Sequence, residues 1–98
     1  MAITIKWSTN ARNSRKSIFN YWNNRNKSRT YSNKLFILFN EALNQVSYLN
    51  EIGKPTDIIY VRIKIVSHFE LIYSISATQI TVLDIWDSRQ NPENFPIE

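Results

Sequence analysis

The stretch that decides the fold runs from residue 31 to residue 49 and reads YSNKLFILFNEALNQVSYL. Its apolar residues recur at the i, i+3, i+4, i+7 spacing of one helix face, which predicts a long amphipathic helix. These residues are Tyr31, Leu35, Leu38, Phe39, Ala42, Leu43, Val46 and Leu49. Gly53 and then Pro55 follow, an order typical of a helix that a left-handed glycine terminates.

A strand and a first helix are predicted upstream. Residues 2–7 alternate between apolar and polar, as in a short amphipathic strand. Residues 8–10, Ser-Thr-Asn, are good N-cap types, and apolar residues recur after them at helical spacing as far as Trp22. Residues 23–28 are polar and predict a turn. The two helices should therefore form an antiparallel hairpin that buries a stripe of each.

Beyond Pro55 the hydrophobic period changes to two. Three strands are predicted, at about residues 59–66, 69–76 and 79–86, with hairpin-length gaps between them. The fold class is therefore α+β with the order β-α-α-β-β-β. The helical hairpin is expected to pack on one face of a mainly antiparallel four-stranded sheet.

The register of the first hairpin follows from matching apolar with apolar residues. Ile65 is predicted to lie opposite Phe69, because a slip of one residue would bury the polar set. This register also sets Lys64 opposite Glu70, where the two charges can pair. Arg62 and Lys64 are then predicted on the open face of the sheet, away from the helices.

Length and composition bound the class of protein. The 98 residues fit a single domain, residues 1–98, with an irregular tail over residues 87–98. Without cysteine and with one glycine, disulfides, thiolate zinc sites and glycine-rich phosphate loops are excluded. Asp84 and Asp87 are too few ligands for a metal site. We expect a cytoplasmic domain with no cofactor, metal or membrane segment, because no apolar run nears the roughly 20 residues that span a bilayer.

Charge is distributed unevenly along the chain. Residues 1–34 contain eight Lys and Arg and no Asp or Glu, whereas all eight acidic residues follow. Such asymmetry indicates an anionic partner for the first third, for example nucleic acid, the ribosome or an acidic protein. A solvated basic helix face is the alternative.

The order of elements and four short segments together resemble the RelE/ParE superfamily, the toxins of bacterial type II toxin–antitoxin modules. The segments are residues 7–8 (Trp-Ser), 51–55 (Glu-Ile-Gly-Lys-Pro), 61–64 (Val-Arg-Ile-Lys) with 71–73 (Leu-Ile-Tyr), and 84–92 (DIWDSRQNP). The resemblance covers essentially the whole chain. It implies a growth-arresting toxin, of the kind associated with plasmid stabilization.

RelE-like members cleave mRNA on the ribosome without a metal, and the resemblance assigns that chemistry to particular residues. Arg62, Lys64 and Arg89 match basic residues that contact phosphate in this endoribonuclease, or mRNA interferase, pattern. Glu70 and Phe95 depart from it, because a strand Arg and a Tyr are expected there. His68 is the residue that could take over acid–base work, since its unperturbed pKa is about 6.5. The predicted catalytic set is therefore Arg62, Lys64, Arg89 and His68.

ParE-like members instead bind DNA gyrase and do not act as catalysts. Their tail has the pattern H-x-R-R-D-P, in which Arg89 matches and Asp87, Gln90 and Asn91 depart. Ribosome-dependent mRNA cleavage, with loss of translation, is the favoured function, gyrase inhibition is the alternative, and an inactive relative that only binds its partner is a third. Whether the chain is an enzyme therefore stays open. The resemblance also implies a small antitoxin with an acidic, apolar C-terminal segment, which would mask the toxin.

Overall fold

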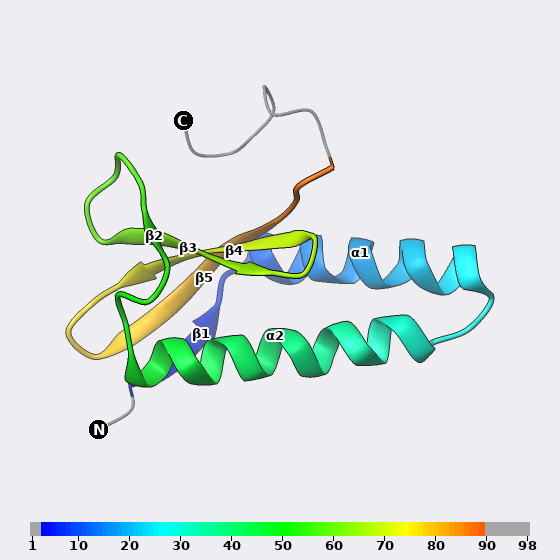
Figure 1. Cartoon of the computed structure of the whole chain (residues 1–98), viewed down its shortest axis with the longest axis horizontal. Helices are drawn as coiled ribbons and strands as arrows, with labels where there is room; N and C mark the ends of the chain where they lie inside the picture. Colours follow the sequence, from blue (N-terminus) through cyan, green and yellow to red (C-terminus); the bar gives the residue numbers. More distant parts are fainter. Residues whose placement is uncertain (1–2, 90–98) are drawn as a thin grey trace.

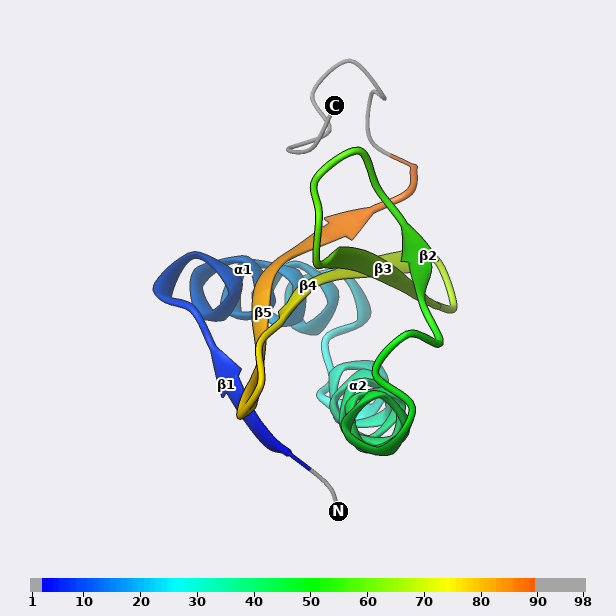
Figure 2. The ribbon, with the colours of Figure 1, turned by 90° about the vertical axis from the view of Figure 1, so that its left-hand side faces the viewer.

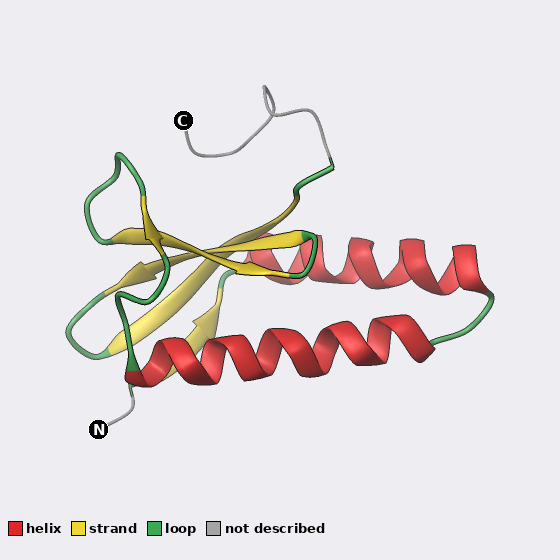
Figure 3. Cartoon of the chain, in the orientation of Figure 1, coloured by secondary structure: helices red, strands yellow, loops and turns green. Residues whose placement is uncertain are grey.

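The computed structural model describes residues 3–89. Its elements are β1 (Thr4–Trp7), α1 (Thr9–Asn26), α2 (Thr30–Tyr48), β2 (Lys54–Pro55), β3 (Val61–Val66), β4 (Phe69–Ile75) and β5 (Gln79–Asp87). The two long helices run side by side along one side of the strands (Figures 1 and 3). The predicted α+β order is confirmed, and the two-residue β2 is an addition to it.

The five strands form one sheet in the order β1-β5-β4-β3-β2. β1 is parallel to β5, and the other pairs are antiparallel. Seen along the helices, α2 lies beneath the curved sheet and α1 lies beside β5 (Figure 2). The main core joins both helices to the sheet through Ala11, Leu35, Phe39, Leu43, Phe69, Leu71 and Val82. Neither helix in residues 3–89 has the length and apolar character that crossing a bilayer requires.

The start of α1 is where the sequence predicts it. Ser8 is the N-cap, and its hydroxyl oxygen accepts a hydrogen bond of 3.0 Å from the Ala11 amide. The predicted turn at residues 23–28 begins four residues too early, because α1 continues to Asn26 and closes at Lys27, whose φ is 55°. Contacts across the hairpin hold this last part of the helix: Asn23 accepts a hydrogen bond from the Ser32 hydroxyl at 2.5 Å. Tertiary packing here overrides a weak local helix propensity.

The end of α2 differs from the prediction in its mechanism. The helix ends at Tyr48 with Leu49 as its C-cap, and Gly53 does not have a positive φ. Gly53 is required for space instead. A Cβ at this position would lie 2.7 Å from the carbonyl oxygen of Ile63 and 2.7 Å from the phenol oxygen of Tyr73.

The predicted register of β3 and β4 is wrong by one residue. Ile65 lies opposite Glu70 and Val66 lies opposite Phe69, so the hairpin turn is two residues long, with Ser67 at a φ of 57°. Sequence alternation could not fix the register, because β4 is buried on both faces: Leu71 and its neighbour Ile72 are 0% and 1% exposed.

This shift exchanges the two faces of β3. Lys64 now pairs with Leu71, on the face that the helices cover, and Arg62 shares that face. The opposite face carries a small apolar layer of Val61, Ile63 and Ile72, flanked by Leu83 and Trp86. The prediction of an open basic sheet face is therefore wrong.

Candidate functional site

Arg62 is engaged in holding the linker between α2 and β2. Its Nη1 donates hydrogen bonds to the carbonyl oxygens of Gly53 at 2.7 Å and Glu51 at 3.1 Å. The buried Tyr73 fixes the same linker, since its hydroxyl donates to the Asn50 carbonyl at 2.8 Å and accepts from the Gly53 amide at 3.1 Å. Burial raises the pKa of the Tyr73 phenol. The Nη1 group of Arg62 thus serves the linker, because both of its hydrogen bonds go to backbone carbonyls.

Arg89 lies just after β5 and forms a two-point ion pair with Asp87. The guanidinium donates to one carboxylate oxygen from Nε at 3.1 Å and to the other from Nη2 at 2.8 Å. These hydrogen bonds lower the pKa of Asp87 and raise that of Arg89. The same guanidinium stacks over the Trp22 ring, 5.1 Å from its centroid.

His68 occupies the exposed turn between β3 and β4, next to the end of β5. Its carbonyl oxygen accepts hydrogen bonds of 2.8 Å from the amide and from the hydroxyl of Ser88. The hydrogen bonds from Arg89 are the main cause of the lowered Asp87 pKa, and the electrostatic interaction with His68 is a minor cause. His68 and Arg89 therefore share one end of the sheet.

The four predicted catalytic residues do not converge. Arg62 lies four residues before the end of β3, about 13 Å along the strand, and points to Gly53, whereas Arg89 and His68 lie beyond the strand ends. Lys64 is half-buried between them. Their catalytic roles stay a prediction. The predicted ion pair of Lys64 with Glu70 is wrong, because Glu70 faces the opposite side beside Ile65.

The described residues end at Arg89, before three positions that the resemblance singles out. Phe95 falls where the RelE pattern has its Tyr. Most of the predicted tail, with its Gln90 and Asn91, also falls outside the described residues.

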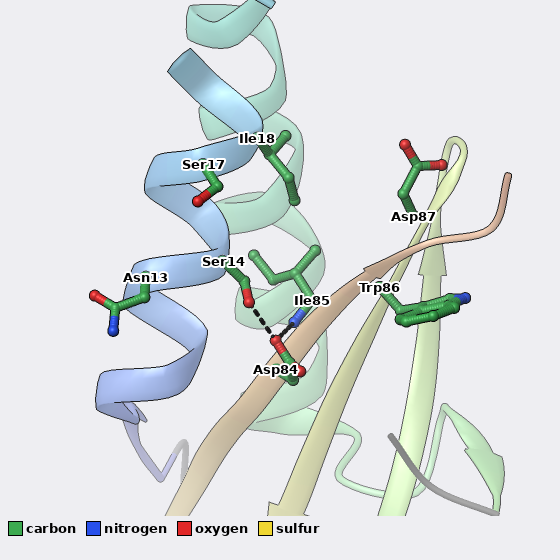
Figure 4. A pocket seen from close by; sticks show the side chains of 8 residues that line it. All are labelled: Asn13, Ser14, Ser17, Ile18, Asp84, Ile85, Trp86 and Asp87. Atoms are coloured by element: carbon green, nitrogen blue, oxygen red, sulfur yellow. Dashed lines mark hydrogen bonds between the residues drawn. The ribbon is translucent and has the colours of Figure 1, made fainter. Parts of the chain in front are cut away.

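A second group of polar residues joins α1 to β5. Figure 4 shows the Ser14 hydroxyl directed at Asp84, where it donates a hydrogen bond of 2.6 Å, and the Ile85 amide donates to the same oxygen at 2.8 Å. A shallow cavity of about 300 Å³ lies here, with Asp87 also on its wall. The Asp84 carboxylate therefore anchors α1. Within residues 3–89, no three His, Cys, Asp or Glu side chains gather as metal ligands would.

Sequence reasoning missed the aromatic surroundings of Arg89. A neighbouring cavity of about 470 Å³ is lined by Tyr21, Trp22, Asp87 and Arg89, among others. The Trp22 ring on its wall also contacts Tyr31 edge-to-face, at a centroid distance of 4.9 Å. The spacing Asp-x-Arg at residues 87–89 is the signal for the ion pair. The stacking on Trp22 joins residues 67 positions apart and leaves no local signal.

Comparison with solved structures identifies the fold. The chain superposes on a chain of the structure described as "Chromosomal ParDE TA system from P. aeruginosa", with a TM-score of 0.66 and 19% identity. The match covers 86% of this chain and 94% of that one. The predicted RelE/ParE-like fold is confirmed. No protein-family model matches the chain, and no curated protein sequence is significantly similar to it.

Proposed function

We propose that this chain is the toxin of a two-component toxin–antitoxin module. Two observations support the proposal. The fold matches a chain from a ParDE toxin–antitoxin structure over most of both chains, and the four sequence segments of the RelE/ParE pattern occur in order along the chain. A basic first third of the molecule fits a phosphate-rich target.

We further propose that the toxin acts by binding its target, as ParE-like members bind gyrase, and not by cutting RNA. The arrangement of Arg62 carries this proposal. Phosphodiester cleavage needs cations aimed at the developing phosphate charge and a group that takes the proton. Here Arg62 donates to the carbonyls of Gly53 and Glu51, and Asp87 already neutralises Arg89. A toxin that acts only by binding needs neither cations aimed at a reacting phosphate nor a group that takes a proton.

Ribosome-dependent mRNA cleavage is the second candidate, and the end of the sheet favours it. His68 and Arg89 lie at this end, and Lys64 lies two residues inside the end of β3. These three could act on RNA if Arg89 exchanged Asp87 for a phosphate. Phosphate is a suitable bidentate partner for a guanidinium.

An antitoxin is the proposed partner. Several large apolar side chains of α2 and the segment after it are exposed, among them Ile37, Tyr48, Leu49 and Ile52. An amphipathic segment with acidic residues would cover such side chains and also meet the positive net charge of +4. Masking of the toxin by this segment is the expected control of its activity.

Two parallel assays with the purified chain separate the candidate targets. One measures DNA supercoiling and DNA cleavage by purified gyrase, and the other measures cell-free translation with mapping of mRNA ends. Accumulation of gyrase-cleaved DNA with intact translation supports the binding mechanism. Cut mRNA that appears only with ribosomes supports the second candidate instead, and activity in neither assay contradicts both.

A further inference from the structure

A groove between α1 and α2 is lined by positive charge. It has a volume of about 560 Å³, and its walls include Arg12 and Lys16 from α1 and Arg29 from the turn before α2. Of the residues in the described part of the chain, no Asp or Glu lines it. The groove is separate from the Arg89 region, since the two have no lining residue in common.

The donors of this groove are arranged in two facing rows. Arg12, Lys16 and Asn20 are spaced four residues apart on α1, so they lie on one face at intervals of about 6 Å. Arg29 and Asn33 have the same spacing on the opposite wall. Cationic and amide donors in regular rows suit a partner that presents acceptors at regular intervals.

Arg12, Lys16 and Arg29 of the groove have no acidic partner among residues 3–89. In this part of the chain the ion pair is that of Arg89 with Asp87, and the side chains of the three groove cations donate no hydrogen bond. Like charges held close together repel one another, and a polyanion relieves this repulsion while releasing its own counterions.

The groove also offers an aromatic surface. Phe36 is 48% exposed on its wall and rests edge-to-face on Phe19, with ring centroids 6.4 Å apart. An exposed ring beside cations is the arrangement on which single-stranded bases stack. The bases of a duplex are paired and stacked on one another and cannot reach such a ring, so the groove suits a single strand.

From these features we propose that the α1–α2 groove binds a single strand of nucleic acid, with phosphates along the Arg12–Lys16–Arg29 rows and a base on Phe36. An acidic peptide is the less suitable occupant. An amphipathic segment needs an apolar stripe to pack on. Among residues 3–89 the groove offers one exposed apolar side chain, Phe36, whereas Tyr48 and Leu49 lie outside it. Such binding by the purified chain does not require the toxin function.

Fluorescence anisotropy with labelled 12-nucleotide oligo(dT) and oligo(U) tests the proposal, at salt concentrations from 50 to 200 mM. The triple variant Arg12→Gln/Lys16→Gln/Arg29→Gln should weaken binding at least about tenfold and flatten the salt dependence by about two units of slope. The matched control Lys6→Gln/Lys34→Gln/Lys54→Gln removes the same charge outside the groove and should weaken binding less than about threefold. Phe36→Ala should weaken it about fivefold or more. Thermal melts verify that each variant is folded.

Four outcomes would overturn the proposal. One is the absence of oligonucleotide binding at 50 mM salt, and another is an equal loss in the two triple variants, which would mean attraction by net charge alone. A duplex that binds as tightly as a single strand, or a poly-glutamate peptide that displaces the oligonucleotide at equal charge concentration, would also contradict it. A preference between oligo(dT) and oligo(U) then identifies DNA or RNA as the ligand.

Discussion

The guanidinium of Arg62 donates a hydrogen bond of 2.7 Å to the carbonyl oxygen of Gly53. This contact ties β3 to the linker that leaves α2, and a second bond from the same nitrogen to Glu51 extends it. A residue that the RelE pattern assigns to phosphate thus supports the fold. Replacement of Arg62 should therefore lower the stability of the fold, whether or not it changes binding to a target.

Arg62→Ala should lower the free energy of unfolding by about 1 kcal/mol, because two carbonyls lose a charged donor at a partly exposed site. Arg62→Lys should recover part of the loss through a single donor. Lys64→Ala, on the same strand face, should change stability by less than about 0.5 kcal/mol. Urea unfolding measures all three, and an Arg62→Ala protein as stable as the wild type would contradict this role.

Gly53→Ala should destabilise the protein by about 1–3 kcal/mol, because its Cβ would overlap the Ile63 carbonyl and the Tyr73 hydroxyl. Removing the hydroxyl with Tyr73→Phe opens one of these two contacts. The double variant should therefore lose less stability than the sum of the single variants. Additive losses in urea unfolding would show that this contact is not the cause.

Tyr73 should make stability fall at alkaline pH. Burial raises its pKa in the fold above the ordinary value of 10.0, so the neutral phenol stabilises the fold fully below about pH 10. This contribution is lost as the pH rises from 10 through the raised pKa of the fold. Between pH 9 and 11, Tyr73→Phe should lose less stability than the wild type. Tyr60→Phe, at an exposed phenol, should follow the wild type, and identical slopes for all three proteins would refute this assignment.

Asp87 should make stability fall at acid pH. Its pKa is lowered by the Arg89 hydrogen bonds, so its contribution is present above the unfolded pKa of about 3.9 and is lost as the pH falls through the lowered value. Because Arg89 is half exposed, Asp87→Asn should cost less than about 1 kcal/mol at pH 7. The difference should shrink as the pH falls below about 3.9 toward the lowered pKa. A difference that does not change with pH would point to packing instead of the ion pair.

Much of the fold could be predicted from the sequence because its signals are local. The periodicity of residues 31–49 gives α2 to within a residue at each end, and the cap type of Ser8 gives the start of α1. The register of β3 and β4 could not be derived in this way. It depends on which apolar face the helices cover, and β4 is apolar on both.

The candidate site was predictable only in part. The position of Arg89 just beyond the last strand could be predicted, because it follows from a local signal, the length of that strand. The role of Arg62 depends on the register and on carbonyls 9 and 11 residues away, which no sequence pattern reports. The predicted pairing of Lys64 with Glu70 is wrong because it also depends on the register. A shift of one residue places Glu70 on the other face of the sheet.

We propose that the chain arrests growth by binding its target and not by cleaving mRNA. Induced expression in a bacterial host without antitoxin, with pulse labelling of DNA and protein synthesis, distinguishes the two mechanisms. We expect DNA synthesis to fall first, with an SOS response, while protein synthesis continues. Immediate loss of protein synthesis with intact replication and cut mRNA would contradict it.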